Sequence, residues 1–132
     1  MATGQIVTTV GKKLILNRTF KATPDYTAPS LFSVGTGTTT PVIGDTGLGT
    51  AVSIDGDNFK EFVSGYPSLD ETNIQSTIRC FINSLEANGN DLTEFGILNS
   101  DGTKILFSRA VFTTLSKTSS TEVTFIQKDK IN

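Results

Sequence analysis

The sequence predicts an all-β fold: a single-domain antiparallel β-sandwich, jelly-roll-like or immunoglobulin-like, over residues 1–132. Thr and Gly are abundant and nine of the aromatic residues are Phe, a composition that favours strands and turns over helices. Apolar and polar residues alternate from Thr72 to Leu85, which is the period of a half-buried strand. The segment from Asp91 to Leu115 has the pattern of a β-hairpin. The length fits one domain.

Residues 1–30 are predicted to be an N-terminal arm, and the sequence leaves open whether this segment is extended or belongs to the core. The run from Leu14 to Leu16 is compatible with a helix turn or with a strand. A strand is favoured because three nearby threonines lower the helix propensity: Thr8, Thr9 and Thr19.

A short strand is predicted around Leu31 to Val34, and a Gly- and Thr-rich loop over 33–50. This loop lacks the Gly-Lys-Thr or Gly-Lys-Ser of a P-loop, and Thr40 stands where a dinucleotide loop needs its third glycine. Loops of this length without secondary structure are usually functional or disordered, so we expect an interface in which glycines allow close backbone approach. The expected interface residues are Gly35, Thr36, Gly37, Thr38, Thr39 and Pro41.

Residues 51–63 are predicted to form a hairpin around a turn at 55–58. A calcium loop starting at Asp55 is excluded, because Phe59 and Lys60 occupy its fifth and sixth positions. In the alternating strand, one face is expected to point into the core: Ile74, Ser76, Ile78, Cys80 and Ile82.

The hairpin at 91–115 has the densest run of large apolar residues, so its strands are expected at the centre of a sheet. Its turn is predicted at Asn99, Asp101 and Gly102, residue types that tolerate left-handed backbone conformations. We expect five residues of the two predicted units to be mostly buried: Ile78, Cys80, Phe95, Phe107 and Phe112. A final strand is predicted from Thr121 to Gln127.

Glu94 lies inside the first hairpin strand, which is unusual because the other carboxylates fall mostly in predicted turns. Pairing Leu98 with Thr103 around a four-residue turn places Glu94 opposite Phe107, with Arg109 as its diagonal neighbour. A structural ion pair between Glu94 and Arg109 is therefore favoured over a catalytic carboxylic acid.

Composition argues against several functional classes. Charged residues make up 18% of the chain, the net charge is −2, and no basic patch is present, so nucleic acid is not expected as a partner. No His is present, and Cys80 is the only cysteine, so we expect neither an enzyme nor a cofactor or thiolate metal site. No membrane span or signal peptide is expected, which predicts assembly in a cytoplasm.

Two blocks of the sequence resemble a family of small tailed-bacteriophage virion proteins, described as tail-fibre or tail-associated. The first runs from Phe32 to Pro41 and continues with Asp45, Thr46 and Leu48, similar to the family's aliphatic-Gly-Thr-Gly-polar-polar-x-Pro and Asp-Thr-x-Leu. The second runs from Thr93 to Phe112. It is similar to the family's Glu-x-Gly-Leu-Phe-Asn-x-Asp-Gly followed by Leu-x-x-Arg-x-x-Phe. The resemblance covers about residues 31–126.

This resemblance implies a non-enzymatic virion component that acts through contacts with other virion proteins. We expect a tail-associated fibre, adaptor or baseplate module, assembled in the host cytoplasm as a homo-oligomer, with a trimer favoured. One alternative is a capsid decoration protein. Another is a host-surface glycan-binding module, which is disfavoured because the chain has no Trp and only two Tyr to stack on sugars.

Overall fold

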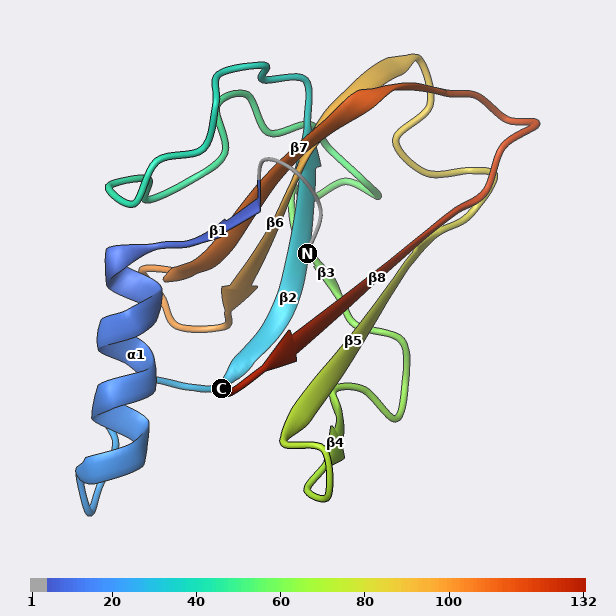
Figure 1. Ribbon diagram of the computed structural model, residues 1–132. Coiled ribbons are helices and arrows are strands. Elements are labelled where there is room, and N and C mark those ends of the chain that lie inside the picture. The colour runs from blue at the N-terminus through green and yellow to red at the C-terminus, as the bar shows by residue number, and fades with distance from the viewer. Residues whose placement is uncertain (1–4) are drawn as a thin grey trace.

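The computed structural model describes residues 5–132 and confirms the predicted single-domain β-sandwich (Figure 1). Two antiparallel sheets pack against each other, and α1 (Thr9–Phe20) is the only helix of the described residues. The larger sheet has five strands in the order β1 (Gln5–Val7), β7 (Leu106–Lys117), β6 (Asn90–Asn99), β2 (Pro29–Gly35) and β3 (Lys60–Glu61). The smaller sheet has three strands in the order β4 (Ser68–Asp70), β5 (Gln75–Ile82) and β8 (Val123–Lys130).

The chain crosses between the sheets after β3, after β5 and after β7, and Figure 1 shows the last two connections at the same end of the sandwich. The β5–β6 crossover contains Ala87 and Gly89, which have positive φ angles of 54° and 85°. Gly adopts this conformation without a Cβ clash, so Gly89 suits the sharp change of direction. The Asn88-Gly89 connection therefore joins two sheets and does not close a hairpin.

The core lies between the sheets and is dominated by aromatic and aliphatic side chains. Phe95 of β6 stacks on Phe125 of β8 with 4.6 Å between ring centroids, so this contact joins the two sheets. The predicted core residues Ile78, Cys80 and Phe95 are buried. Phe107 and Phe112 are only partly buried and pack against the edge of the core.

The predicted hairpin consists of β6 and β7, with β6 at the centre of the larger sheet. The prediction of a four-residue turn is wrong, because six residues, 100–105, connect the strands and Leu98 pairs with Leu106. Gly102 does not adopt a positive φ. The loop is held by side chains instead: buried Asn99 accepts a hydrogen bond from the Ile105 amide, and Asp101 accepts one from the Thr27 amide.

The prediction of a strand at Leu14–Leu16 is wrong, because these residues lie in a helix. The prediction of an extended arm over 1–30 is also wrong for most of residues 5–30, and residues 1–4 lie outside the part of the chain that the structure describes. Residues 5–7 form β1, and α1 follows at once. Thr8 starts the helix: its hydroxyl accepts a hydrogen bond from the Gly11 amide at 3.0 Å and donates one to the Leu106 carbonyl. This N-cap, together with Leu14 packed into the protein, outweighs the weak helix propensity of the threonines.

Three smaller predictions also change. Strand β5 begins at Gln75, and Ile74 has a positive φ and is half exposed, so the inward face is made by Ile78, Cys80 and Ile82. The segment 51–63 is not a hairpin, because its short strand β3 pairs with β2. The last strand extends to Lys130, since β8 pairs with β5 along its whole length.

Candidate functional site

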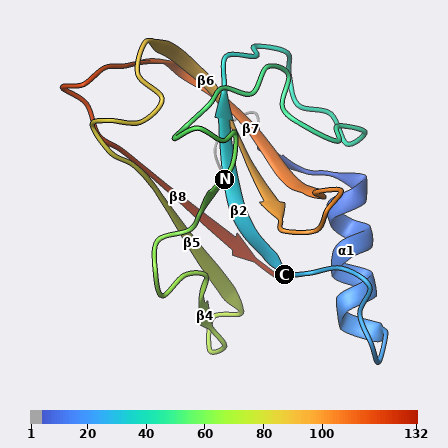
Figure 2. The same ribbon diagram turned by 180° about the vertical axis from the view of Figure 1, so that it is seen from behind.

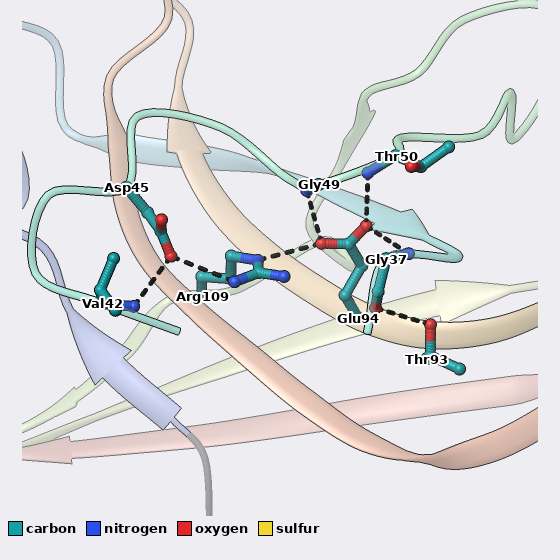
Figure 3. Close-up of polar contacts among 8 residues, drawn as sticks. All are labelled: Gly37, Val42, Asp45, Gly49, Thr50, Thr93, Glu94 and Arg109. Carbon is teal, nitrogen blue, oxygen red and sulfur yellow. Dashed lines mark hydrogen bonds and ion pairs between the residues drawn. The ribbon is translucent and has the colours of Figure 1, made fainter. Parts of the chain in front are cut away.

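The most strongly organised polar site is the buried carboxylate of Glu94, in the central strand β6 (Figure 3). The side chain is fully buried and accepts four hydrogen bonds. Oε2 accepts from the amides of Gly37 and Thr50, both at 2.7 Å. Oε1 accepts from the Gly49 amide at 2.7 Å and from Arg109 Nε at 3.0 Å. One side chain therefore binds both ends of the 36–50 loop.

Arg109 extends this network from β7. In the pairing of β6 with β7, Arg109 lies opposite Gly96, so it reaches Glu94 as a diagonal neighbour on the same face of the sheet. Its Nη1 lies 3.1 Å from Oδ2 of Asp45, which also accepts a hydrogen bond from the Val42 amide at 3.0 Å. The predicted structural pair of Glu94 and Arg109 is thus part of a three-residue ion network that includes Asp45, which sequence reasoning placed in a turn.

The base of the loop is closed by the backbone. The Thr36 amide donates to the Thr50 carbonyl at 2.9 Å, and the Val52 amide donates to the Val34 carbonyl at 3.0 Å. Thr93 adds a side-chain bond from its hydroxyl to the Gly37 carbonyl at 2.8 Å. In the middle of the loop, the Ile43 carbonyl accepts a hydrogen bond at 2.8 Å from the amide of Thr9, the first residue of α1. The 36–50 loop is therefore fixed at its base, and Ile43 is fixed to the helix.

Gly35 and Gly37 allow this close packing. A Cβ on Gly37 would collide with the Glu94 carboxylate, and a Cβ on Gly35 would collide with the carbonyl of Thr50. The sequence predicted close backbone approach at these glycines, but against a neighbouring subunit. The structure gives them an intramolecular role, which is to let the loop reach the buried carboxylate.

The six predicted interface residues differ in their exposure. Thr38 and Thr39 are exposed, Thr36 and Gly37 are half-buried, and Gly35 and Pro41 are buried. Sequence reasoning did not select the two most exposed apolar residues of the loop, Val42 and Ile43, which are 54% and 55% exposed. Two adjacent large aliphatic residues beside Pro41 are the signal that could have identified them.

The electrostatics of Glu94 favour a structural role. Burial alone would raise the pKa of this carboxyl group, but the amides of Thr50 and Gly49, the Arg109 guanidinium and the Gly37 amide together hold the pKa below its ordinary value. The carboxylate is ionised at neutral pH, and its oxygens are occupied by protein donors. A group in this state is a poor general acid or base.

Sequence reasoning missed a second buried charged site. Glu86 is 4% exposed and accepts hydrogen bonds from Lys60 Nζ at 2.6 Å and from the Asn83 amide at 2.9 Å. Burial acts to raise the pKa of Glu86, but these bonds and the charge of Lys117 lower it below its ordinary value. Lys117 is 1% exposed, and its ammonium group donates to Asn88 Oδ1 at 2.7 Å. Lys60 and Lys117 therefore bind side chains of the β5–β6 crossover, which they hold in place.

A hollow of about 500 Å³ lies between the sheets. Phe95, Phe112, Phe125 and Ile126 line it, and Lys128 is the only charged residue on its wall. Among residues 5–132, no three His, Cys, Asp or Glu side chains are grouped so that they could hold a metal ion. Cys80 is a buried free thiol, and burial raises its pKa.

No helix within residues 5–132 has the length and apolar character needed to cross a membrane. Comparison of the chain with protein-family models, with curated proteins and with solved structures gives no match.

Proposed function

We propose that this protein is a non-enzymatic structural component of a tailed-phage virion. It is tail-associated, as a fibre, adaptor or baseplate module, and acts by binding neighbouring virion proteins. The observation that carries the proposal is the 36–50 loop, which buried Glu94 holds in one conformation while Val42 and Ile43 stay exposed. A binding surface that is ordered before it meets its partner loses less conformational entropy on association.

The sequence resemblance supports the same proposal. Its two blocks, 32–48 and 93–112, lie far apart in the chain, and they meet in the network around Glu94 (Figure 3). Gly37 and Asp45 come from the first block, and Glu94 and Arg109 come from the second. Residues that carry the resemblance therefore take part in fixing the loop, together with Gly49 and Thr50 just beyond the first block. This is expected if the loop conformation is the property that such proteins share.

The test is incorporation into particles. In phage that encodes the protein, the double substitution Val42→Ser and Ile43→Ser should reduce the amount of protein in purified virions, measured by quantitative mass spectrometry. Because both side chains are more than half exposed, the free variant should unfold at the wild-type temperature. Leu85→Ser, at a residue that is 85% exposed in the β5–β6 crossover, is the matched control.

The copy number measured in the same experiment separates tail from capsid. A tail component is present in few copies per particle, and a decoration protein covers the capsid in many copies. A high copy number would replace the tail proposal with capsid decoration. Absence of the wild-type protein from purified virions would overturn the virion proposal itself.

A further inference from the structure

The outward face of α1 combines basic and large apolar side chains. Lys12, Leu16 and Phe20 follow one another at intervals of four residues, so they share one face, and Lys13 lies beside them. Leu16 is 60% exposed and Phe20 is 80% exposed, while Leu14 on the opposite face is buried. A helix face that exposes two such large apolar side chains to solvent is a candidate binding surface.

The charge of this helix differs in sign from that of the rest of the chain. Residues 5–24 contain four basic residues and no acidic residue, although the whole chain has a net charge of −2. Lys21 pairs with Asp25 at the helix end, but Lys12 and Lys13 form no ion pair within the described residues. The charges of Lys12 and Lys13 therefore lie on or beside the face that carries Leu16 and Phe20.

A complementary surface lies at the turn after β4. Within six residues it combines two exposed apolar side chains, Leu69 (70% exposed) and Ile74 (50% exposed), with two exposed carboxylates, Asp70 and Glu71. Asp70 accepts hydrogen bonds from the amides of Thr72 and Asn73, both at 3.1 Å, which fixes the turn. Strand β4 is also an edge strand, so one side of its backbone is open to a partner.

We propose that the outward face of α1 in one copy binds the β4 turn of a second copy, with Lys12 and Lys13 against Asp70 and Glu71. This inference rests on the proposed function, since it names how copies of the chain associate. The two surfaces carry opposite charges, and both expose large apolar side chains, so one chain carries both halves of the contact.

The two surfaces lie on different sides of the molecule, with the sheets between them (Figures 1 and 2). The contact is therefore heterologous: each copy uses its helix toward one neighbour and its β4 turn toward the other. Heterologous contacts close into rings or continue as filaments. A ring of three copies is the trimer that the sequence resemblance leads us to expect.

The experiment is sedimentation velocity of the full chain over a range of protein concentrations. The wild type should self-associate. The double variant Lys12→Glu and Lys13→Glu should weaken association by about tenfold or more, and so should Glu71→Lys. A chain that carries all three substitutions should associate more strongly than either variant. Every contact of a ring of three then sets the acidic helix against the Glu71→Lys turn, in which only Asp70 stays acidic.

Glu122→Lys reverses an exposed charge in the β7–β8 crossover and is the control, which should associate as the wild type does. Phe20→Ser should weaken association without lowering the unfolding temperature, because the side chain is 80% exposed. A wild type that stays monomeric at all concentrations, or a triple variant that associates no better than the two weakened variants, would overturn the proposal. Since this assay needs no particle, its failure is distinct from failure of virion incorporation.

Discussion

Arg109 lies opposite Gly96 in the pairing of β6 with β7, yet its guanidinium binds Glu94, two residues further along the strand, at 3.0 Å. Between them, Gly96 leaves room for the side chains of Leu48 and Leu106, which would lie 2.8 and 3.0 Å from a Cβ placed on it. The ion pair is therefore a property of the sheet face, and it positions the carboxylate under the 36–50 loop.

Removing either member of this pair should destabilise the protein strongly. Glu94→Gln and Arg109→Met should each lower the free energy of unfolding by about 3–5 kcal/mol, because each leaves a buried charge with fewer partners. The double variant should lose less than the sum of the two, since each single change already breaks the shared contact. Urea denaturation of the four proteins measures this, and additive losses would show that the pair does not interact.

Gly37→Ala should be destabilising although it adds only one methyl group. The Cβ would collide with the Glu94 carboxylate, so the loop would have to move away from its hydrogen bonds, at a cost of about 1–3 kcal/mol. Gly47→Ala, in the same loop, is the matched control, because nothing lies within 4 Å of the added Cβ. Equal stability of the two variants in chemical denaturation would contradict the packing described for Gly37.

Stability should fall in mild acid because of Glu94. Its pKa in the folded protein lies below the ordinary value near 4.5, so the folded state binds this proton less readily than the unfolded chain. The resulting stabilisation is fully present well above pH 4.5, declines as the pH falls through that value, and is lost below the folded-state pKa. Glu94→Gln should flatten the dependence of unfolding free energy on pH in this range, and Glu122→Gln is the control for removing an exposed carboxylate. A wild-type slope in Glu94→Gln would contradict the assignment.

Hydrogen exchange should separate the fixed part of the loop from its exposed part. The amides of Gly37, Gly49 and Thr50 should exchange slowly in the wild-type monomer, because they donate to a buried carboxylate. The exposed amides of Thr38 and Thr39 should exchange fast and slow down only on assembly. Glu94→Gln should speed exchange at the amides of Gly37, Gly49 and Thr50. Fast exchange at those three in the wild type would contradict a loop fixed by Glu94.

The position of α1 should depend on Thr8. Thr8→Val keeps the side-chain volume but removes the bonds to Gly11 and Leu106, so it should lower the free energy of unfolding by about 1–2 kcal/mol and speed amide exchange in the helix. Thr19→Val, at an exposed position of the same helix, should change stability by less than about 0.5 kcal/mol. An unchanged Thr8→Val variant would show that the cap does not hold the helix.

The sequence was sufficient to predict those strands in which the pattern of apolar residues reflects burial. Ile78, Cys80 and Ile82 alternate with polar residues, and β5 follows them. Phe95 lies in a dense apolar run, and β6 is central. The register of the hairpin could not be predicted from the residue types in its turn. Asp101 and Gly102 do not form a tight turn, and the side chain of Asn99 instead holds a six-residue loop. Even so, Glu94 and Arg109 share a face in both registers, so their pairing could be predicted.

Most of the site around Glu94 could not be predicted. Its main partners are the amides of Gly37, Gly49 and Thr50, which lie 44–57 residues earlier in the chain. A backbone amide leaves no mark on the sequence, since every residue except proline has one. The helix was missed for a different reason. Leu16 and Phe20 are exposed, so the apolar residues of 9–20 do not form the one-sided pattern that identifies a surface helix.

Recognition of the 36–50 loop through main-chain amides leaves much of its sequence free to evolve. Glu94 binds Gly37, Gly49 and Thr50 through groups that do not depend on side-chain identity, and nothing lies within 4 Å of a Cβ placed on Gly44 or Gly47. The exposed tip could therefore exchange residues, and with them the partner that we propose for it, while the carboxylate keeps the loop in place. In this respect the sandwich resembles a scaffold that presents a variable segment from a constant support, and the segment around Val42 and Ile43 is where new specificity would be engineered first.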